Sequence, residues 1–235
     1  MVLKILVINP ISISKWDTLD KDIVLKYITS NTKVDFINLK DAPETIECFY
    51  DDALTAPLVA KAAYNAEKDG YNAIVIGCFD DPGLDASREK VSIPVLGIGE
   101  TSMTIACLLG HKFAIISVGS NSRAIYERRA LELGLINRLA YSCGIESKVL
   151  DLRKNENKIK EMIYKEAKKA IEEFGAEVIV LGCGGMIGFS EDLNKMLNVP
   201  IIDPLPLTIK IAETLAILGL KHSKAWLYNV PKHKR

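Results

Sequence analysis

The chain has 235 residues, of which 49% are hydrophobic and 7% aromatic. Thirty basic residues balance thirty acidic ones, so the formal net charge is zero. A nucleic-acid surface normally shows a clustered basic excess, which this sequence has only at residues 231–235, a stretch typical of a solvated terminus. We therefore expect a globular protein without a nucleic-acid partner.

The sequence also indicates a cytoplasmic protein with reduced thiols. Residues 1–4 lead straight into a short apolar stretch without a signal-peptide pattern. No apolar run approaches the roughly 18 residues of a membrane span, so we expect no membrane partner. The five cysteines are widely scattered without a CxxC pair, and the three histidines lack metal-ligand spacing. A disulfide framework and a metal site are therefore not expected.

Strand-like and helix-like segments alternate along the first part of the chain. Val, Ile and Leu dominate the strand-like runs, whereas the helical stretches carry apolar residues three and four positions apart. The predicted strands are residues 2–9, 34–39, 73–77 and 95–98, and the predicted helices are residues 17–29 and 55–68.

The pattern restarts after residue 100. Helix 101–109, strand 113–118 and helix 122–133 come first, followed by a polar segment over 151–157 and a long helix over 158–174. A strand over 177–181, a turn and helix over 184–197, a strand over 199–202 and a helix over 205–218 complete the chain.

Repeated β-α-β units with nearly continuous apolar strands predict an α/β fold whose parallel sheets carry helices on both faces. The stretch 97–100 is interpreted as a crossing point between two similar lobes. We expect a first lobe of residues 1–97 plus 206–235 and a second lobe of residues 98–205.

Two cysteines, Cys78 and Cys183, each follow an apolar strand and a glycine and precede a turn that leads to a helix. They are 105 residues apart, since 183 − 78 = 105, which is close to half the chain. A helix N-terminus lowers the pKa of a nearby thiol, and flanking glycines let a ligand approach the backbone. Two thiols presented alike by two half-chains suggest a pair that faces across a cleft. Such a pair suits a reaction that needs a proton acceptor and a proton donor on opposite faces of one carbon.

Inert burial is the ordinary interpretation of a free cysteine, and we apply it to the other three thiols. Cys107 lies in an apolar helical stretch, Cys143 precedes a glycine in a predicted loop, and Cys48 has no distinguishing context.

Four turns at the ends of predicted strands are candidates for holding a ligand. In parallel sheets, ligands bind beyond the carboxyl ends of strands, where backbone N–H groups and helix starts converge. The candidates in these turns are Asn9, Ile11, Ser12, Phe79, Asp80, Ser117, Gly119, Ser120, Gly184 and Gly185.

Other interpretations of these turns remain open. The glycines of 182–188 fit neither GxGxxG nor GxxxxGK[ST], so a nucleotide site is disfavoured. The turn at Ser117 and Ser120 is also typical of an ordinary capped helix start. Asp80 and Asp81 permit a metal site, but a pair that caps the following helix is the preferred interpretation.

At these residues the chain resembles the aspartate/glutamate racemase superfamily and, within it, the hydantoin racemase family. The resemblance covers essentially the whole chain. Its most specific parts are Ile8-Asn9-Pro10, the run Gly77-Cys78-Phe79-Asp80-Asp81-Pro82-Gly83-Leu84, the run Pro94-Val95-Leu96-Gly97-Ile98-Gly99-Glu100, and Leu181-Gly182-Cys183-Gly184-Gly185-Met186.

The resemblance implies two pseudo-symmetric Rossmann-like lobes with an active site between them and no cofactor. Cys78 and Cys183 match the two catalytic cysteines of the family. One of them, as a thiolate, would remove a proton from the stereocentre, and the other, as a thiol, would deliver a proton to the opposite face. The four turns would hold the carbonyls of the substrate and stabilise the enolate-like charge. The fold family usually associates, so a homo-oligomer is expected.

Two positions depart from the family pattern. Family members commonly continue Asn-Pro with Asn-Thr or Asn-Ser, whereas this chain has Ile11 and Ser12. An alanine usually follows the second cysteine, whereas this chain has Gly184. The apolar Ile11 removes a polar amide, which leaves the substrate open.

The predicted function is a cofactor-independent racemase that inverts a stereocentre beside a carbonyl, with a 5-substituted hydantoin as the best candidate substrate. Three alternatives remain: an aspartate or glutamate racemase, a maleate-isomerase-like enzyme, and a non-catalytic protein that binds a small ligand. Retention of both cysteines favours racemisation over decarboxylation, which can use one.

Overall fold

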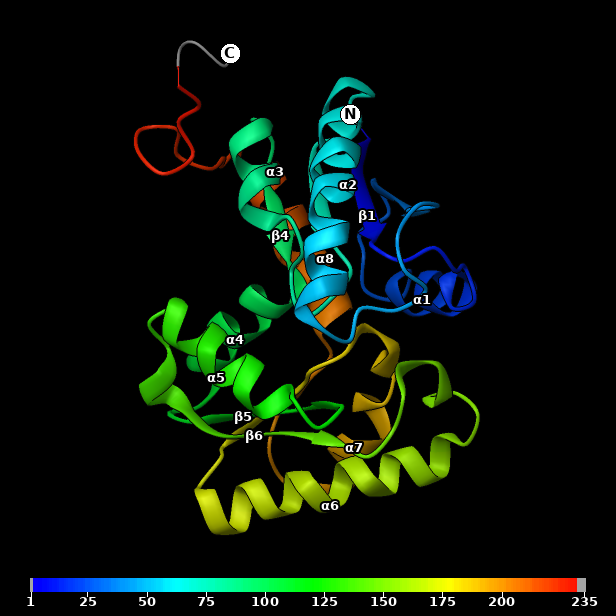
Figure 1. Cartoon of the computed structure of the whole chain (residues 1–235), viewed down its shortest axis with the longest axis vertical. Helices are drawn as coiled ribbons and strands as arrows, with labels where there is room; N and C mark the ends of the chain where they lie inside the picture. Colours follow the sequence, from blue (N-terminus) through cyan, green and yellow to red (C-terminus); the bar gives the residue numbers. More distant parts are fainter. Residues whose placement is uncertain (1, 232–235) are drawn as a thin grey trace. The chain divides into compact units, whose positions relative to one another are not determined.

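A computed structural model describes residues 2–231 of the chain, so most of the basic end lies outside the described residues. The chain divides into two compact units (Figure 1). The first takes the residues up to Ile98 and resumes at Thr208, and the second runs from Gly99 to Leu207. Each unit carries one of the two cysteines singled out above.

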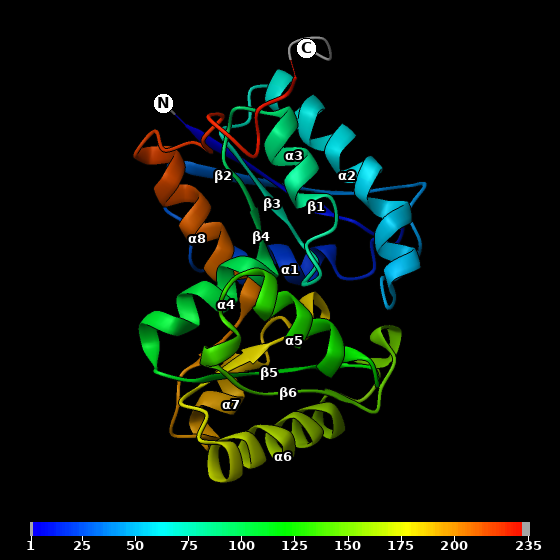
Figure 2. The same cartoon turned by 60° about the vertical axis from the view of Figure 1, so that its left-hand side comes forward.

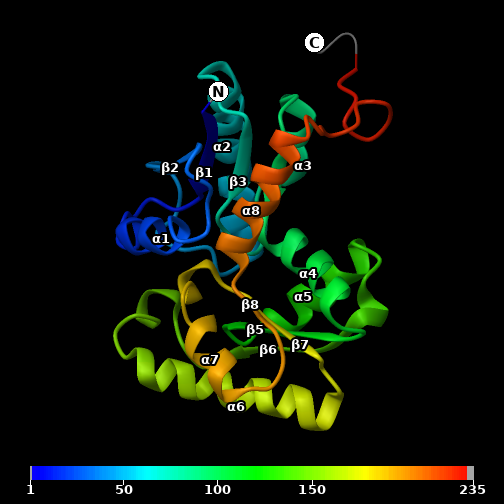
Figure 3. The same cartoon turned by 180° about the vertical axis from the view of Figure 1, so that it is seen from behind.

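The first unit is built on a four-stranded parallel sheet in the order β2-β1-β3-β4. Helices cover both of its faces, with α2 and α3 on one side and α8 on the other (Figures 2 and 3). The elements of this unit are β1 (Leu3–Asn9), α1 (Asp17–Val24), β2 (Thr32–Asn38), α2 (Phe49–Lys68), β3 (Ala73–Ile76), α3 (Leu84–Lys90), β4 (Val95–Gly97) and the greater part of α8 (Pro204–Ile217).

The second unit repeats this plan with a four-stranded parallel sheet in the order β6-β5-β7-β8. Short 3-10 helices at Ile136–Arg138, Val149–Asp151 and Gly184–Met186 interrupt its connections. Its main elements are α4 (Ile98–Leu109), β5 (Phe113–Val118), α5 (Ser122–Glu132), β6 (Leu139–Ile145), α6 (Glu156–Phe174), β7 (Val178–Leu181), α7 (Ser190–Met196) and β8 (Ile201–Ile202).

The two sheets correspond strand by strand, which confirms the predicted α/β class with parallel sheets. Ile8 of β1 is paired with Ile76 of β3, and Ile116 of β5 is paired with Leu181 of β7. The two glycines that precede the cysteines extend these ladders alike. The N–H of Gly77 donates to the carbonyl of Ile8 at 2.9 Å, and the N–H of Gly182 donates to the carbonyl of Ile116 at 2.7 Å.

One strand, β6, was absent from the sequence-based prediction, which treated Cys143 as part of a loop. Residues 139–145 read Leu-Ala-Tyr-Ser-Cys-Gly-Ile, and the glycine and small polar residues weaken the strand pattern. The strand forms because it pairs with β5 at the edge of the sheet, from Leu139 to Ile145 with one register shift that leaves Ala140 without a pairing partner in β5. Tertiary pairing therefore overrides the local propensity.

Two helices, α1 and α2, differ from the prediction by five residues or more at one end. Helix α1 ends at Val24 rather than at residue 29, and the Thr29 hydroxyl donates to the carboxylate of Glu213 in α8. Helix α2 begins at Phe49 rather than at residue 55 and contains Pro57. Pro57 lies inside the helix, where its missing N–H interrupts the ladder of backbone hydrogen bonds.

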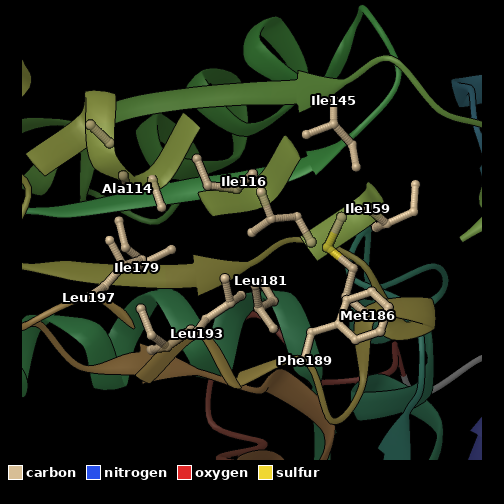
Figure 4. Packing of buried hydrophobic residues seen from close by; sticks show 14 of the residues in the cluster. Ala114, Ile116, Ile145, Ile159, Ile179, Leu181, Met186, Phe189, Leu193 and Leu197 are labelled. Atoms are coloured by element: carbon tan, nitrogen blue, oxygen red, sulfur yellow. The ribbon is translucent and has the colours of Figure 1, made fainter. Parts of the chain in front are cut away.

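The core of the second unit lies between its sheet and the helices α6 and α7 (Figure 4). Helix α6 is amphipathic, begins at Asn155, whose side chain accepts from the N–H of Lys158, and ends at Gly175 in the left-handed region. Alternate strand residues face this helix. The cluster includes Ala114, Ile116, Ile179 and Leu181 from the strands, Ile159, Ile163, Ala167 and Ala170 from α6, and Leu193 and Leu197.

No helix within residues 2–231 combines the length and the apolar character needed to cross a bilayer.

A buried carboxylate ties α8 to the segment that joins α1 and β2. Glu213 is 1% exposed, and its Oε1 accepts from the backbone N–H of Thr29 at 3.2 Å and from the Thr29 hydroxyl at 2.7 Å. The hydroxyl of Thr32 and the ammonium of Lys210 also donate to this carboxylate. Burial alone would raise the pKa of Glu213, but the donors from Lys210, Thr29 and Thr32 together lower it to about 2.

We expect Glu213→Gln to lower the free energy of unfolding by about 2 kcal/mol at pH 7. The folded pKa lies below the ordinary value of 4.5, so this stabilisation is present above pH 4.5 and is lost as the pH falls toward 2. Urea unfolding at pH 7 and pH 3 measures the effect, and the variant should differ less from the wild type at pH 3. The exposed Glu161 supplies the control Glu161→Gln, which should match the wild type at both values.

Candidate active site

The four predicted turns follow the two central strands of each sheet. Those after β1 and β3 lie side by side in the first unit, because these strands are neighbours and parallel. Those after β5 and β7 lie side by side in the second unit for the same reason. Each unit therefore gathers one cysteine and one polar strand end at the carboxyl edge of its sheet, where ligands of parallel sheets bind.

In the first unit, Asn9 lies directly over the glycine that precedes Cys78. A Cβ atom added to Gly77 would stand 2.4 Å from Oδ1 of Asn9. The amide can take this orientation because Gly77 has no Cβ, and Asn9 as a whole is 6% exposed. The Gly-Cys pair and the Asn9 side chain therefore form one packed unit.

In the second unit, Ser117 takes the equivalent place over Gly182. A Cβ added to Gly182 would stand 2.7 Å from the Cβ of Ser117. The Ser117 hydroxyl donates to the carbonyl oxygen of Gly182 at 2.5 Å, and the Tyr126 hydroxyl from α5 donates to the same oxygen at 3.1 Å. Ser117 and Tyr126 are 1% and 5% exposed, so both hydroxyls are buried. Tyr126 was not among the residues predicted from sequence, because only the fold brings it to β7.

The backbone after each cysteine follows the same turn. The carbonyl of Cys78 accepts from the N–H of Asp81 at 3.1 Å, and the carbonyl of Cys183 accepts from the N–H of Met186 at 3.0 Å. Both thiols belong to partly exposed residues. A 3-10 helix begins directly after Cys183, but α3 begins only at Leu84, so the helix start expected beside Cys78 lies six residues further along (84 − 78 = 6).

The N-cap position of α3 is Gly83 and not one of the two aspartates, and the backbone carbonyl of Asp81 accepts from the N–H of Leu84 at 3.2 Å. Asp81 instead has a φ of 54°, in the left-handed region. Its carboxyl group lies against Gly97, where an added Cβ would stand 2.2 Å away. Asp81 therefore holds the turn after Cys78 against the end of β4.

The other predicted ligand residues differ in exposure. Ile11 and Ser12 are half-buried, and backbone hydrogen bonds hold both, from Leu39 N–H to the Ile11 carbonyl at 2.9 Å and from Ser12 N–H to the Pro43 carbonyl at 3.0 Å. Phe79 is 2% exposed, so its ring belongs to the core. Asp80, Gly119 and Gly184 are half-buried, Ser120 is exposed and Gly185 is buried.

A buried carboxyl group, Asp203, lies at the end of β8 beside the turn that follows Cys183. Its Oδ2 accepts from the N–H of Gly188 at 2.6 Å, and a guanidinium N–H of Arg153 donates to the neighbouring carbonyl of Ile187. Burial raises the pKa of Asp203 to about 6, against the opposing effects of the Gly188 N–H and Arg153. Neither periodicity nor a motif in the sequence predicts this contact.

Within the described part of the chain, no group of three or more His, Cys, Asp or Glu side chains is placed to hold a metal ion.

The model of the Asp/Glu/hydantoin racemase family matches residues 5–212. The chain belongs to this family. It is therefore a racemase of the Asp/Glu/hydantoin type, which confirms the family expected from the Gly-Cys motifs.

Curated relatives and solved structures agree with this assignment. A hydantoin racemase from a Pseudomonas species is 37% identical over 87% of this chain and 82% of its own length. A hydantoin racemase from Paenarthrobacter aurescens is 35% identical over 99% of both chains. The crystal structure of an allantoin racemase from Pseudomonas fluorescens superposes with a TM-score of 0.93 at 27% identity, and covers 99% of both chains.

The three remaining cysteines of the racemase are not alike. Cys48 is exposed at the start of α2, so the expectation of burial was wrong for it. Cys143 lies in β6, where burial and the carboxylate of Glu166 raise the pKa of its thiol to about 12. Burial also raises the pKa of Cys107, against the charge of Arg138.

We expect iodoacetamide to modify Cys143 far more slowly than Cys48 at pH 7. A pKa of about 12 instead of the usual 9 leaves about 1,000-fold less thiolate, and the thiolate is the nucleophile. Peptide mass spectrometry after timed alkylation measures both rates in one sample. Equal alkylation rates of Cys143 and Cys48 in the folded protein would contradict this prediction. This holds even if Cys143 reacts more slowly in the folded protein than in urea.

Proposed function

We propose that this racemase inverts the C5 stereocentre of 5-substituted hydantoins, with Cys78 and Cys183 as the acid–base pair. The named activity of two relatives that are 35% and 37% identical supports the substrate class. The matched Gly-Cys turns at the ends of β3 and β7 support the pair, because they present two thiols in equivalent backbone settings.

The proposed reaction begins with one cysteine as thiolate and the other as thiol. The thiolate takes the C5 proton, and the electrons of the broken C–H bond move to the C4 carbonyl to form an enolate. The second thiol then gives its proton to the opposite face of C5 and becomes the thiolate. Exchange with water resets the pair, and the reverse reaction exchanges the two roles.

The polar strand ends supply the remaining groups of the proposed site. The enolate oxygen gains charge during the reaction, so preformed donors aimed at it lower the barrier. Asn9 and the backbone of the turns at Phe79–Asp80, Gly119–Ser120 and Gly184–Gly185 are the proposed donors. Ile11 and Ser12, which follow Asn9, are proposed to contact the substituent on C5.

Deuterium exchange tests this proposal. Single enantiomers of alkyl hydantoins, aryl hydantoins, allantoin, aspartate and glutamate are incubated with the enzyme in deuterated water, beside a sample without enzyme. We expect solvent deuterium at C5 together with loss of optical rotation for hydantoins, and neither change for the amino acids. Two results would overturn the proposal. One is turnover of the amino acids alone, and the other is that the enzyme turns over none of the compounds that raise its melting temperature.

The second candidate function, a non-catalytic protein that binds the same ligands, rests on Ile11. An apolar side chain in this position cannot give the hydrogen bond that an amide gives. If the protein only binds ligands, hydantoins should raise its melting temperature, and the increase should persist in Cys78→Ala and Cys183→Ala. The wild type should then show no turnover. Enzyme-dependent exchange in the wild type rejects it.

We expect Ile11→Asn to change the substrate preference rather than the chemistry. Allantoin carries a polar ureido group on C5, whereas an alkyl hydantoin carries an apolar group. Restoring an amide should raise kcat/KM for allantoin relative to an alkyl hydantoin by about tenfold, the effect of one hydrogen bond to a buried polar group. An unchanged ratio would remove Ile11 from the proposed site.

A homo-oligomer and a cytoplasmic location stay predictions. Sedimentation equilibrium of the purified racemase at several concentrations would measure the subunit number directly.

A further inference from the structure

We propose that Ser117 and Tyr126 are positioning residues for Cys183 and do not bind the substrate. This inference rests on the proposed function only in that Cys183 is taken as one of the two reacting thiols. It reassigns Ser117, which the sequence pattern placed among the substrate ligands. The two buried hydroxyls that meet at the carbonyl of Gly182 carry the argument.

The Gly182 carbonyl belongs to the peptide that leads into Cys183. Ser117 donates to this oxygen at 2.5 Å and Tyr126 donates to it at 3.1 Å, so both of its lone pairs are used. The two hydroxyl oxygens also lie 3.2 Å apart, which makes a closed triangle of polar atoms. The plane of this peptide is therefore held from two elements, β5 and α5.

The peptide on the other side of Cys183 is held as well. The carbonyl of Cys183 accepts from the N–H of Met186 at 3.0 Å, and Cys183 adopts an extended backbone with φ −152° and ψ 133°. With both flanking peptides fixed, the direction of the Cα–Cβ bond is fixed, and with it the position from which the thiol acts. Proton transfer requires such placement, since small displacements of a reacting group cost large factors in rate.

Ser117 has little capacity left for a substrate. Its single proton is directed to the Gly182 carbonyl, and the residue is 1% exposed. A hydroxyl that binds substrate would need a free proton or exposed lone pairs. The geometry therefore assigns it to the support of Cys183.

The cysteine of the first unit has a different support. Asn9 lies over Gly77, as Ser117 lies over Gly182, but the side chain there is an amide and not a pair of hydroxyls. The loss of the Tyr126 hydroxyl should therefore affect Cys183 and leave Cys78 unchanged. The two cysteines of one molecule can be compared directly.

The test uses the full chain with Tyr126→Phe and Ser117→Ala, and Tyr141→Phe as the matched control. Tyr141 is in the same unit and donates to Glu166 at 2.8 Å, so the control loses a comparable hydroxyl. Iodoacetamide alkylation followed by peptide mass spectrometry gives the ratio of the Cys183 rate to the Cys78 rate. Kinetics on the best hydantoin give kcat and KM.

We expect Tyr126→Phe and Ser117→Ala each to change the Cys183:Cys78 ratio at least threefold. Each should also lower kcat about tenfold with KM within twofold, while Tyr141→Phe leaves all three quantities unchanged. An unchanged Cys183:Cys78 ratio in both folded variants would overturn the inference. A raised KM with an unchanged ratio in Ser117→Ala would also overturn it, because that result would identify Ser117 as a substrate ligand. If the wild type turns over no hydantoin, the proposed function fails, but the alkylation ratio still decides the inference.

Discussion

Replacement of either Cys78 or Cys183 by serine is expected to lower kcat/KM for hydantoin racemisation at least a thousandfold. A serine hydroxyl keeps the size of the thiol but is a far weaker acid, so it neither removes nor delivers the proton near neutral pH. General acid–base groups contribute about 100- to 10,000-fold each. The loss should appear in kcat with little change in melting temperature, because both cysteines are partly exposed and serine is nearly isosteric.

Isotope exchange makes this prediction sharper. With one thiol left, a single face of C5 is still served, so each variant should exchange the C5 hydrogen of one enantiomer without inverting it. The two variants should prefer opposite enantiomers, after subtraction of the exchange that occurs without enzyme. Because the equilibrium constant of a racemisation is one, kcat/KM is equal in both directions, and only exchange can separate the two thiols.

Cys107→Ser is the control for both experiments. The Cys107 thiol donates weakly to the carbonyl of Met103 at 3.4 Å within α4, and a serine hydroxyl makes the same contact. The control should therefore keep full activity. If Cys78→Ser or Cys183→Ser keeps more than a tenth of the activity, the two-cysteine mechanism is wrong, although membership of the racemase family stands.

Sequence periodicity predicted the fold because buried parallel strands are nearly continuous apolar runs. β3 and β7 read Ala-Ile-Val-Ile and Val-Ile-Val-Leu, and all eight residues are buried. Edge elements carry a weaker signal, since only one side of the strand is paired. Residues 141–144 of β6 are Tyr, Ser, Cys and Gly, which do not form an apolar run. This strand forms because it pairs with β5 and not because of its composition.

The sequence singles out residues of the proposed site only where a motif marks them. Gly-Cys after a strand singled out Cys78 and Cys183, and the fold then places each glycine beneath a polar residue of the neighbouring strand. Tyr126 and Asp203 carry no such signal, because each acts through a contact with the backbone of a distant segment. Contacts of this kind depend on the three-dimensional packing, which spacing along the chain does not encode.

The second large effect is expected from Gly144→Ala in β6. A Cβ at this position would stand 1.8 Å from the carbonyl oxygen of Gly119 and 2.9 Å from its backbone nitrogen. A backbone cannot rotate away as a side chain does, so the turn at Gly119–Ser120 must move. We expect a loss of about 3 kcal/mol in the free energy of unfolding, at the upper end for overpacked sites, and a lower kcat/KM. Urea unfolding and hydantoin kinetics measure the two effects.

Gly77→Ala is the matched comparison, because its clash involves a flexible side chain. The added methyl group would meet the Asn9 Oδ1 at 2.4 Å, and rotation of the amide relieves the contact. Stability should change by less than about 1 kcal/mol. KM should rise, since the displaced amide is a proposed substrate donor. Equal destabilisation by both substitutions would contradict this prediction. It would mean that the backbone of the Gly119 turn moves as easily as the Asn9 side chain. The close packing of β6 against this turn would then have no role in shaping the proposed site.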